Sequence, residues 1–111
     1  MNLLLIALFW LSYGEHPPSP LRETVQVRAV EQSQAGQLWH DVSVYPPAYG
    51  KPLCGVAEIL ARGYEPAGAL IAWQASPPHA LLINAVAPYA WTHVAAARSG
   101  NVIVVVLVRD C

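Results

Sequence analysis

An unbroken run of seven apolar residues near the end of the chain, Val102–Val108, constrains the fold most strongly. A strand that is apolar on both sides needs cover on both faces of its sheet. The preceding segment Trp91–Arg98 is separated from this run by Ser99-Gly100-Asn101, a turn sequence that predicts a C-terminal β-hairpin. We therefore predict an α+β fold, an α-β-α sandwich in which helices cover both faces of a small antiparallel sheet.

A helix with signals at both ends is predicted early in the domain. Ser19 can cap its first turn, Pro20 suits the first helical position, and Gly36 suits the position just past its end. The segment Thr24–Val30 alternates apolar and polar residues and also fits a strand, so both structures stay open there. We favour a helix over residues 20–35, because its second half is rich in helix-forming residues.

A second helix is predicted over Ala67–Ala75. Pro66 stands at its start, and the segment is apolar nearly all round, which predicts that the helix is buried. Two consecutive prolines end it. Ser76, just before them, can cap a following short turn that runs through His79 to Asn84.

The middle of the chain is predicted to form short elements. Val56–Arg62 is expected to be a short helix that Gly63 ends. Asp41–Val44 alternates in polarity and is expected to be a short edge strand. Tyr45–Pro52 is rich in proline and glycine, a composition that is typical of a loop.

The first residues of the chain form a short apolar segment. Leu3–Leu11 is too short to span a bilayer, and small residues follow it. We predict a signal peptide over residues 1–14, a Pro-rich linker over 15–20 and one domain over 21–111, with no transmembrane segment after cleavage. No basic residue precedes the apolar run, so a retained N-terminal strand or helix is the alternative.

Charge and cysteine content limit the partners and the compartment. Charged residues make up 12% of the chain, the formal net charge is −1 and no basic stripe is present, which argues against nucleic acid as a partner. Cys54 and Cys111 are an even pair, which in an exported protein predicts a disulfide bond. Closing a loop of about 57 residues would stabilise the fold by about 4 kcal/mol. Two free thiols in a cytosolic protein are the alternative.

Three polar side chains stand out against an apolar background. His40 follows Leu38-Trp39, Glu58 lies within an apolar segment, and His79 follows the end of an apolar helix. Two imidazoles and a carboxylate can hold a zinc ion and leave a fourth position open. The same groups could instead transfer protons, with the carboxylate setting a histidine tautomer. Each residue also has an ordinary alternative as a solvated, capping or turn residue.

Four motifs carry a resemblance to a known family, and three of them contain these polar residues. Ala72–His79 resembles a tryptophan, a short polar spacer and Ser-Pro-Gly-His, with Pro78 in place of the glycine. Glu58–Ala61 is similar to the last four residues of Gly-Glu-Asn-Ile-Ala, with Ile59 in place of the asparagine.

The other two motifs complete the pattern. Residues 28–40 are similar to a first helix with a closing histidine, and residues 91–97 are similar to the strand that follows in the family. Over residues 21–111 the chain therefore resembles the CAP superfamily of extracellular domains, which includes cysteine-rich secretory and pathogenesis-related proteins and has the SCP-like fold. The α-β-α sandwich is also the architecture of that family.

The resemblance implies a cavity and a location. It implies a secreted or periplasmic domain, and it places His40, Glu58 and His79 among the cavity residues, which in the family are two histidines and two acids. Ser76 stands at the position of the second acid, and His93 is a further candidate for that vacancy. Some family members bind sterols, lipids or other apolar ligands.

We expect a binding module and not an enzyme, because the sequence has no nucleophile elbow and no His-Glu-x-x-His helix. A small apolar ligand or a component of the cell envelope is the expected partner. One alternative is a zinc-dependent hydrolase that uses the same three residues and a zinc-bound water. A second alternative is a structural, disulfide-stapled component of a larger extracytoplasmic assembly.

Overall fold

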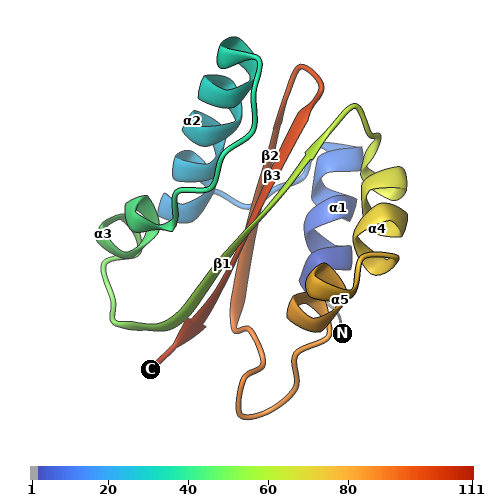
Figure 1. The fold of residues 1–111 in the computed structure, drawn as a ribbon. Coiled ribbons are helices and arrows are strands. Elements are labelled where there is room, and N and C mark those ends of the chain that lie inside the picture. The colour runs from blue at the N-terminus through green and yellow to red at the C-terminus, as the bar shows by residue number, and fades with distance from the viewer. Residues whose placement is uncertain (1–2) are drawn as a thin grey trace.

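The computed structural model describes residues 3–111, which form three layers. The middle layer is an antiparallel sheet of β1 (Leu53–Arg62), β2 (His93–Ser99) and β3 (Val102–Asp110), in the order β1-β3-β2. The helices are α1 (Leu3–Tyr13), α2 (Pro20–Ala35), α3 (Tyr45–Tyr49), α4 (Pro66–Gln74) and α5 (Pro77–Ile83). Figure 1 shows α2 and α3 on one face of the sheet and α1, α4 and α5 on the other. The predicted sandwich and the C-terminal hairpin are confirmed.

The central strand β3 is buried on both faces, as its sequence predicts. Each residue from Val102 to Val108 is at most 1% exposed. Ile103, Val105 and Leu107 pack in the core beneath α1 and α4, whereas the alternate valines pack in a second core beneath α2. Side chains alternate across a strand, so one apolar run serves both cores.

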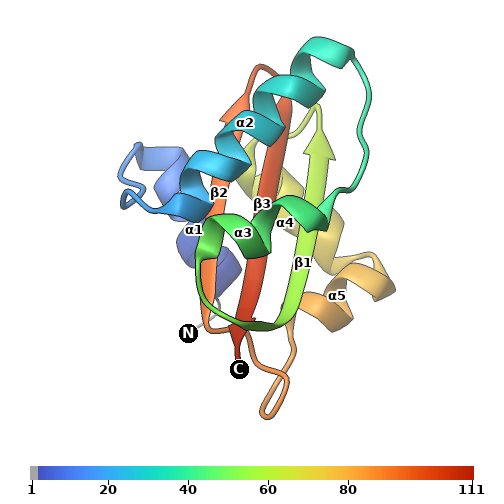
Figure 2. The same ribbon diagram turned by 90° about the vertical axis from the view of Figure 1, so that its left-hand side faces the viewer.

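Helix α2 begins and ends where the sequence predicts, and the Thr24–Val30 segment is helical. The Ser19 hydroxyl oxygen accepts a hydrogen bond from the Arg22 N–H at 3.0 Å, and Gly36 adopts a left-handed φ of 70°. The helix crosses over β2 and β3, as Figure 2 shows. Its buried face therefore sits on the valine side of β3.

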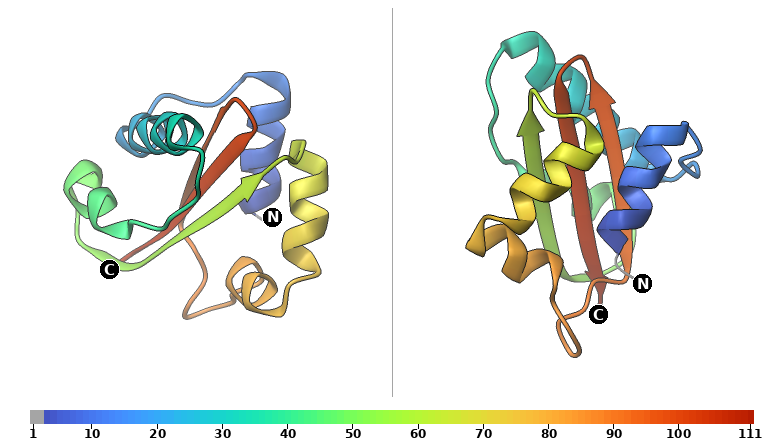
Figure 3. Two further views of the ribbon diagram at one scale, coloured as in Figure 1. Left: turned by 45° about the horizontal axis from the view of Figure 1, so that its top comes forward. Right: turned by 90° about the vertical axis from the view of Figure 1, so that its right-hand side faces the viewer.

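The N-terminal apolar segment forms α1, which packs on the sheet. Leu4, Ala7 and Leu8 are buried in the same core as the α4 tryptophan, and Figure 3 shows α1 and α4 side by side on that face. Cleavage after Gly14 and the retained helix both stay predictions. Within residues 3–111, no helix combines the length and hydrophobicity needed to cross a bilayer.

The helix predicted over Val56–Arg62 is wrong, because this segment belongs to strand β1. Its alanines, leucine and glutamate are good helix formers. Pairing with β3 overrides that preference, since β1 lies against the apolar central strand from Leu53↔Asp110 to Arg62↔Val102. Gly63 ends the strand with a φ of 82°, and its N–H donates to the Asn101 carbonyl at 2.8 Å.

The edge strand predicted over Asp41–Val44 and the loop predicted over Tyr45–Pro52 are also wrong. Val42–Val44 is a single 3₁₀ turn that the Asp41 carboxylate caps, and α3 follows it directly. Two prolines in the first turn of α3 suit a helix start, where the missing N–H groups cost nothing. The segment therefore coils over the sheet and brings Tyr45 into the core, fully buried.

Helix α4 is confirmed, and the predicted turn after it is the short helix α5. Trp73 on α4 is buried, and its indole N–H donates to the Leu60 carbonyl at 3.1 Å. That bond gives a partner to a backbone carbonyl of β1, which is an edge strand and has no neighbouring strand on that side.

The predicted disulfide bond joins Cys54 to Cys111, with the two Cα atoms 4.8 Å apart. It links residues 57 positions apart in the sequence, at the end of the sheet where β1 and β3 first pair. The bridge therefore ties an edge strand to the end of the central strand.

Candidate functional site

Glu58 is the centre of a buried polar cluster between β1 and α2. Its carboxylate accepts two hydrogen bonds from the Arg28 guanidinium, at 2.9 and 2.8 Å. The Tyr45 hydroxyl donates a third, and the Asp41 backbone N–H donates a fourth at 3.2 Å. The Glu58 side chain has no exposed surface, so protein groups replace water around both of its oxygens.

The pKa values of Arg28 and Tyr45 are both shifted upward in this cluster. The hydrogen bond to Glu58 raises the pKa of Arg28 above its usual value, so the guanidinium stays charged. Burial, reinforced by the bond to Glu58, raises the pKa of Tyr45 well above its usual value, so the phenol stays a donor. A bidentate arginine holds a carboxylate in a fixed orientation. Glu58 is therefore a structural anchor in this arrangement.

The cluster also fixes the segment that follows α2. The Trp39 carbonyl accepts a hydrogen bond from Arg28 at 2.5 Å, and the Trp39 N–H donates to the side chain of buried Gln32 at 2.9 Å. The Arg28 guanidinium lies 5.2 Å from the centre of the Trp39 ring. These contacts hold residues 38–41 against the β1 edge of the sheet.

Only two of the three residues predicted as a site lie together. His40 Nδ1 lies 3.5 Å from a Glu58 oxygen, and the His40 side chain is 62% exposed. His79 lies on α5, in the opposite helical layer, where its Nδ1 is 2.9 Å from the Ser76 hydroxyl. His93 lies on β2, at the other edge of the sheet from Glu58, with Nε2 3.1 Å from Asp110.

A zinc ion does not fit this donor set. All the hydrogen bonds to Glu58 would have to be rearranged before its carboxylate could bind a metal. Among residues 3–111, no three His, Cys, Asp or Glu side chains lie close enough together to hold one. Zinc binding therefore stays an expectation from the residue types alone, and we derive no chemical step through a metal.

His79 and Ser76 instead line a groove at the β1 edge, with a volume of about 350 Å³. The wall nearest α2 is Leu38, which belongs to the segment that the Glu58 cluster holds. The floor and the opposite wall come from β1 and α4 and are mostly apolar. The lining residues are Leu38, Leu60, Ala61, Arg62, Tyr64, Ala72, Trp73, Ser76 and His79.

Sequence reasoning missed Arg28, Gln32 and Tyr45 as parts of the site, although α2 carried a signal. Its buried positions are 21, 25, 28, 29 and 32, the spacing of one helix face. A cation and an amide at two of those positions indicate that the buried face meets a polar partner. Glu58, the lone charge in an apolar segment, is that partner.

Comparison with solved structures identifies the fold. The chain matches an extracellular protein containing a SCP domain from Bacillus anthracis str. Ames, with a TM-score of 0.68 at 12% sequence identity. The match covers 89% of this chain and 36% of that protein, so the chain spans well under half of its length. No family model and no curated protein matches the sequence. The chain has the SCP-like fold that its motifs predict.

Proposed function

We propose that this protein is an extracytoplasmic SCP-like binding module that holds a small apolar ligand in the β1-edge groove and does not transform it. The single observation that carries the proposal is the state of Glu58. Its carboxylate is saturated by Arg28, Tyr45 and a backbone N–H, so it positions the groove wall instead of accepting a proton from a substrate.

The chemistry of the groove supports an apolar ligand. Leu38, Leu60 and Trp73 supply carbon surface, while His79 and Ser76 hydrogen-bond to each other. Small-molecule sites are mostly apolar with a few placed polar groups, and volumes of about 300–1,000 Å³ are usual for them. A volume of about 350 Å³ therefore suits a ligand of one or two rings.

Two observations support the extracytoplasmic location. The disulfide bond is typical of proteins that fold in oxidising compartments. The protein with the matching SCP domain is described as extracellular.

Naphthalene, a neutral apolar probe, tests this function when it is titrated into the isotope-labelled full chain and followed by amide and indole NMR shifts. We expect shifts at Leu38, Tyr64 and the Trp73 indole. Leu38→Glu should weaken binding about tenfold, because it places a charge on an apolar wall. The matched control is Leu81→Glu, since Leu81 lies on α5 outside the groove and is 78% exposed.

Two results would contradict the proposal. One is naphthalene binding that Leu38→Glu leaves unchanged, which would place the ligand elsewhere. The other is turnover of a peptide or an ester that His79→Ala or Glu58→Gln abolishes, since the binding module is proposed to be without catalysis.

A further inference from the structure

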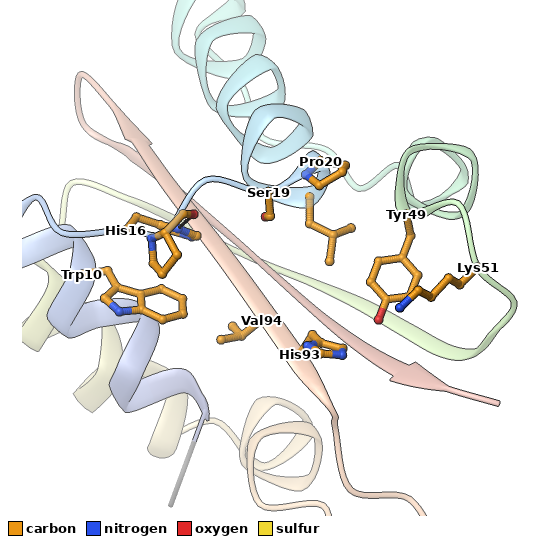
Figure 4. A pocket seen from close by; sticks show the side chains of 10 residues that line it. Trp10, His16, Ser19, Pro20, Tyr49, Lys51, His93 and Val94 are labelled. Carbon is orange, nitrogen blue, oxygen red and sulfur yellow. Dashed lines mark hydrogen bonds between the residues drawn. The ribbon is translucent and has the colours of Figure 1, made fainter.

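A second cleft, of about 330 Å³, lies at the opposite edge of the sheet, over β2. Figure 4 shows it between α1, the start of α2 and α3. Its position and its lining are separate from those of the β1-edge groove, so it is not part of the proposed function. The residues that line it are Trp10, His16, Pro17, Ser19, Pro20, Leu21, Tyr49, Lys51, His93 and Val94.

Two aromatic side chains lie on opposite sides of the cleft, and each is fixed in place by its contacts. Trp10 packs on His16 with ring centres 4.4 Å apart, and His16 Nε2 accepts a hydrogen bond from the Ala96 N–H of β2 at 3.0 Å. Across the cleft, the Tyr49 hydroxyl donates to Asp110 at 2.6 Å. Figure 4 shows Trp10 and Tyr49 on opposite sides, with Val94 between them. A flat apolar ring can lie between such walls.

The charge at the rim is positive. Lys51 is the single permanently charged residue among the described residues that line the cleft. Its ammonium lies 6.0 Å from the centre of the Tyr49 ring, and it forms no ion pair with a carboxylate of residues 3–111. The nearby Asp110 carboxylate is already engaged by Tyr49 and His93. The negative charge of Asp110 remains beside the cleft and partly opposes a bound anion, so the Lys51 ammonium must supply the attraction.

Most polar groups in the cleft already have hydrogen-bond partners. This favours an aromatic ring over a sugar ring as the ligand. Ser19 caps α2, His16 has contacts at both ring nitrogens, and the Tyr49 hydroxyl binds Asp110. A sugar carries several hydroxyl groups that each need a partner, and the cleft leaves few free. An aromatic ring needs none.

From these contacts we propose that the β2-edge cleft binds a small aromatic carboxylate, with its ring between Trp10 and Tyr49 and its carboxylate on the Lys51 ammonium. The site depends on α1, because Trp10 lies on that helix, and on the linker, which carries His16. Charge-assisted contact with Lys51 gives the selectivity for an anion.

The test uses 2-naphthoate, titrated into the full chain and followed by amide and indole NMR shifts and by calorimetry. We expect shifts at the Trp10 indole and at the amides of Val94 and His93. Lys51→Gln should weaken binding about tenfold, and Lys51→Arg should retain it. Trp10→Leu should also weaken binding. If the Trp10→Leu variant folds poorly, the variants of the exposed Lys51 still test the site. Leu38→Glu, in the other groove, is the matched control and should leave naphthoate binding unchanged.

Each contrary outcome has a defined meaning. Equal binding of the neutral 2-naphthamide would overturn the role of Lys51, and tighter binding of glucuronate would overturn the choice of an aromatic ligand. The absence of any shift at Val94 and Trp10 at millimolar naphthoate would overturn the site itself. These results are distinguishable from failure of the proposed function, which is read from neutral naphthalene and Leu38.

Discussion

The two faces of the sheet are covered by layers that are held in different ways. The α2 layer is fastened by a buried ion pair, Arg28 with Glu58, which the Tyr45 hydroxyl completes. The α1 and α4 layer packs through apolar contacts, and its ion pair, between Glu65 and Arg98, lies at the surface. A buried pair fixes one geometry, because any other leaves a charge unpaired in the core. Apolar packing tolerates small shifts more readily.

The two proposed ligand sites also differ in how one of their walls is held in place. The β1-edge groove takes one wall from the segment that the buried cluster fixes, and so its shape depends on Arg28 and Glu58. The β2-edge cleft takes one wall from α1, which is held by packing and by the His16 bond to β2. Each site also takes part of its lining from the other layer, since α4 lines the groove and the start of α2 lines the cleft.

The largest expected effect is the removal of residues 1–14. The loss of buried Leu4, Ala7 and Leu8 should cost about 4–7 kcal/mol, at about 1.5–3 kcal/mol for each buried leucine and less for the alanine. Urea unfolding of the full and the shortened chain measures this cost. Leu8→Ala and Leu5→Ala are a matched pair, because Leu5 lies on the exposed side of α1.

Equal stability of the full and shortened chains would contradict the packing argument and would favour a removable signal peptide. Sequencing the N-terminus of the exported protein decides separately whether cleavage after Gly14 occurs.

The next largest effect is expected for Glu58→Ala, which leaves the buried Arg28 guanidinium without its partner. The free energy of unfolding should fall by about 3–5 kcal/mol. Replacing both members, as Arg28→Met with Glu58→Leu, should recover part of that loss, because no unpaired charge remains but the buried Tyr45 hydroxyl loses its acceptor. Denaturant unfolding of Arg28→Met, Glu58→Leu and the double variant forms a cycle. A double variant as unstable as Glu58→Ala would show that the pair itself stabilises the fold.

A smaller effect is expected from pH, acting through His16 in the other layer. Burial lowers the pKa of His16 below 6.5, so the unfolded chain binds a proton more readily than the folded one. The contribution of His16 to stability is therefore complete above pH 6.5 and decreases as the pH falls from 6.5 through the lowered pKa. Protonation also removes the acceptor for the Ala96 N–H. Unfolding midpoints of the protein and of His16→Gln, compared across this range, should converge toward low pH. A constant difference would contradict this role.

The smallest effect is expected for Arg98→Ala, which removes the surface ion pair of the apolar layer. Arg98 donates two hydrogen bonds to Glu65, but the Glu65 side chain is 78% exposed and water competes for it. We expect little change in the unfolding midpoint, and none in about 1 M salt, which screens exposed charges. A loss as large as that of Glu58→Ala would erase the distinction between the two layers.

Local signals predicted the parts of the fold that depend on neighbouring residues. Helix α2 is bounded by Ser19 and Gly36, and those signals act within a few residues of the helix ends. The run Val102–Val108 likewise identifies the central strand, because its composition leaves no solvent-facing side. In both cases the residues that decide the structure lie within or beside the element.

Long-range contacts decided the parts that sequence reasoning missed. β1 contains good helix formers and becomes a strand by pairing with residues far along the chain. Glu58 was predicted as a site residue from its apolar surroundings. Its partners Arg28 and Tyr45 lie 30 and 13 positions away on other elements, and no periodicity links them.

The order of strands in the sheet also governs when the sheet can form during synthesis. β1 and β2 pair only with β3, and β3 is the last of the three to leave the ribosome. In a nascent chain that lacks β3, the strands β1 and β2 therefore have no strand to pair with. Both apolar cores also lack the side chains that β3 contributes to them. Folding waits until the whole sheet sequence has been translated.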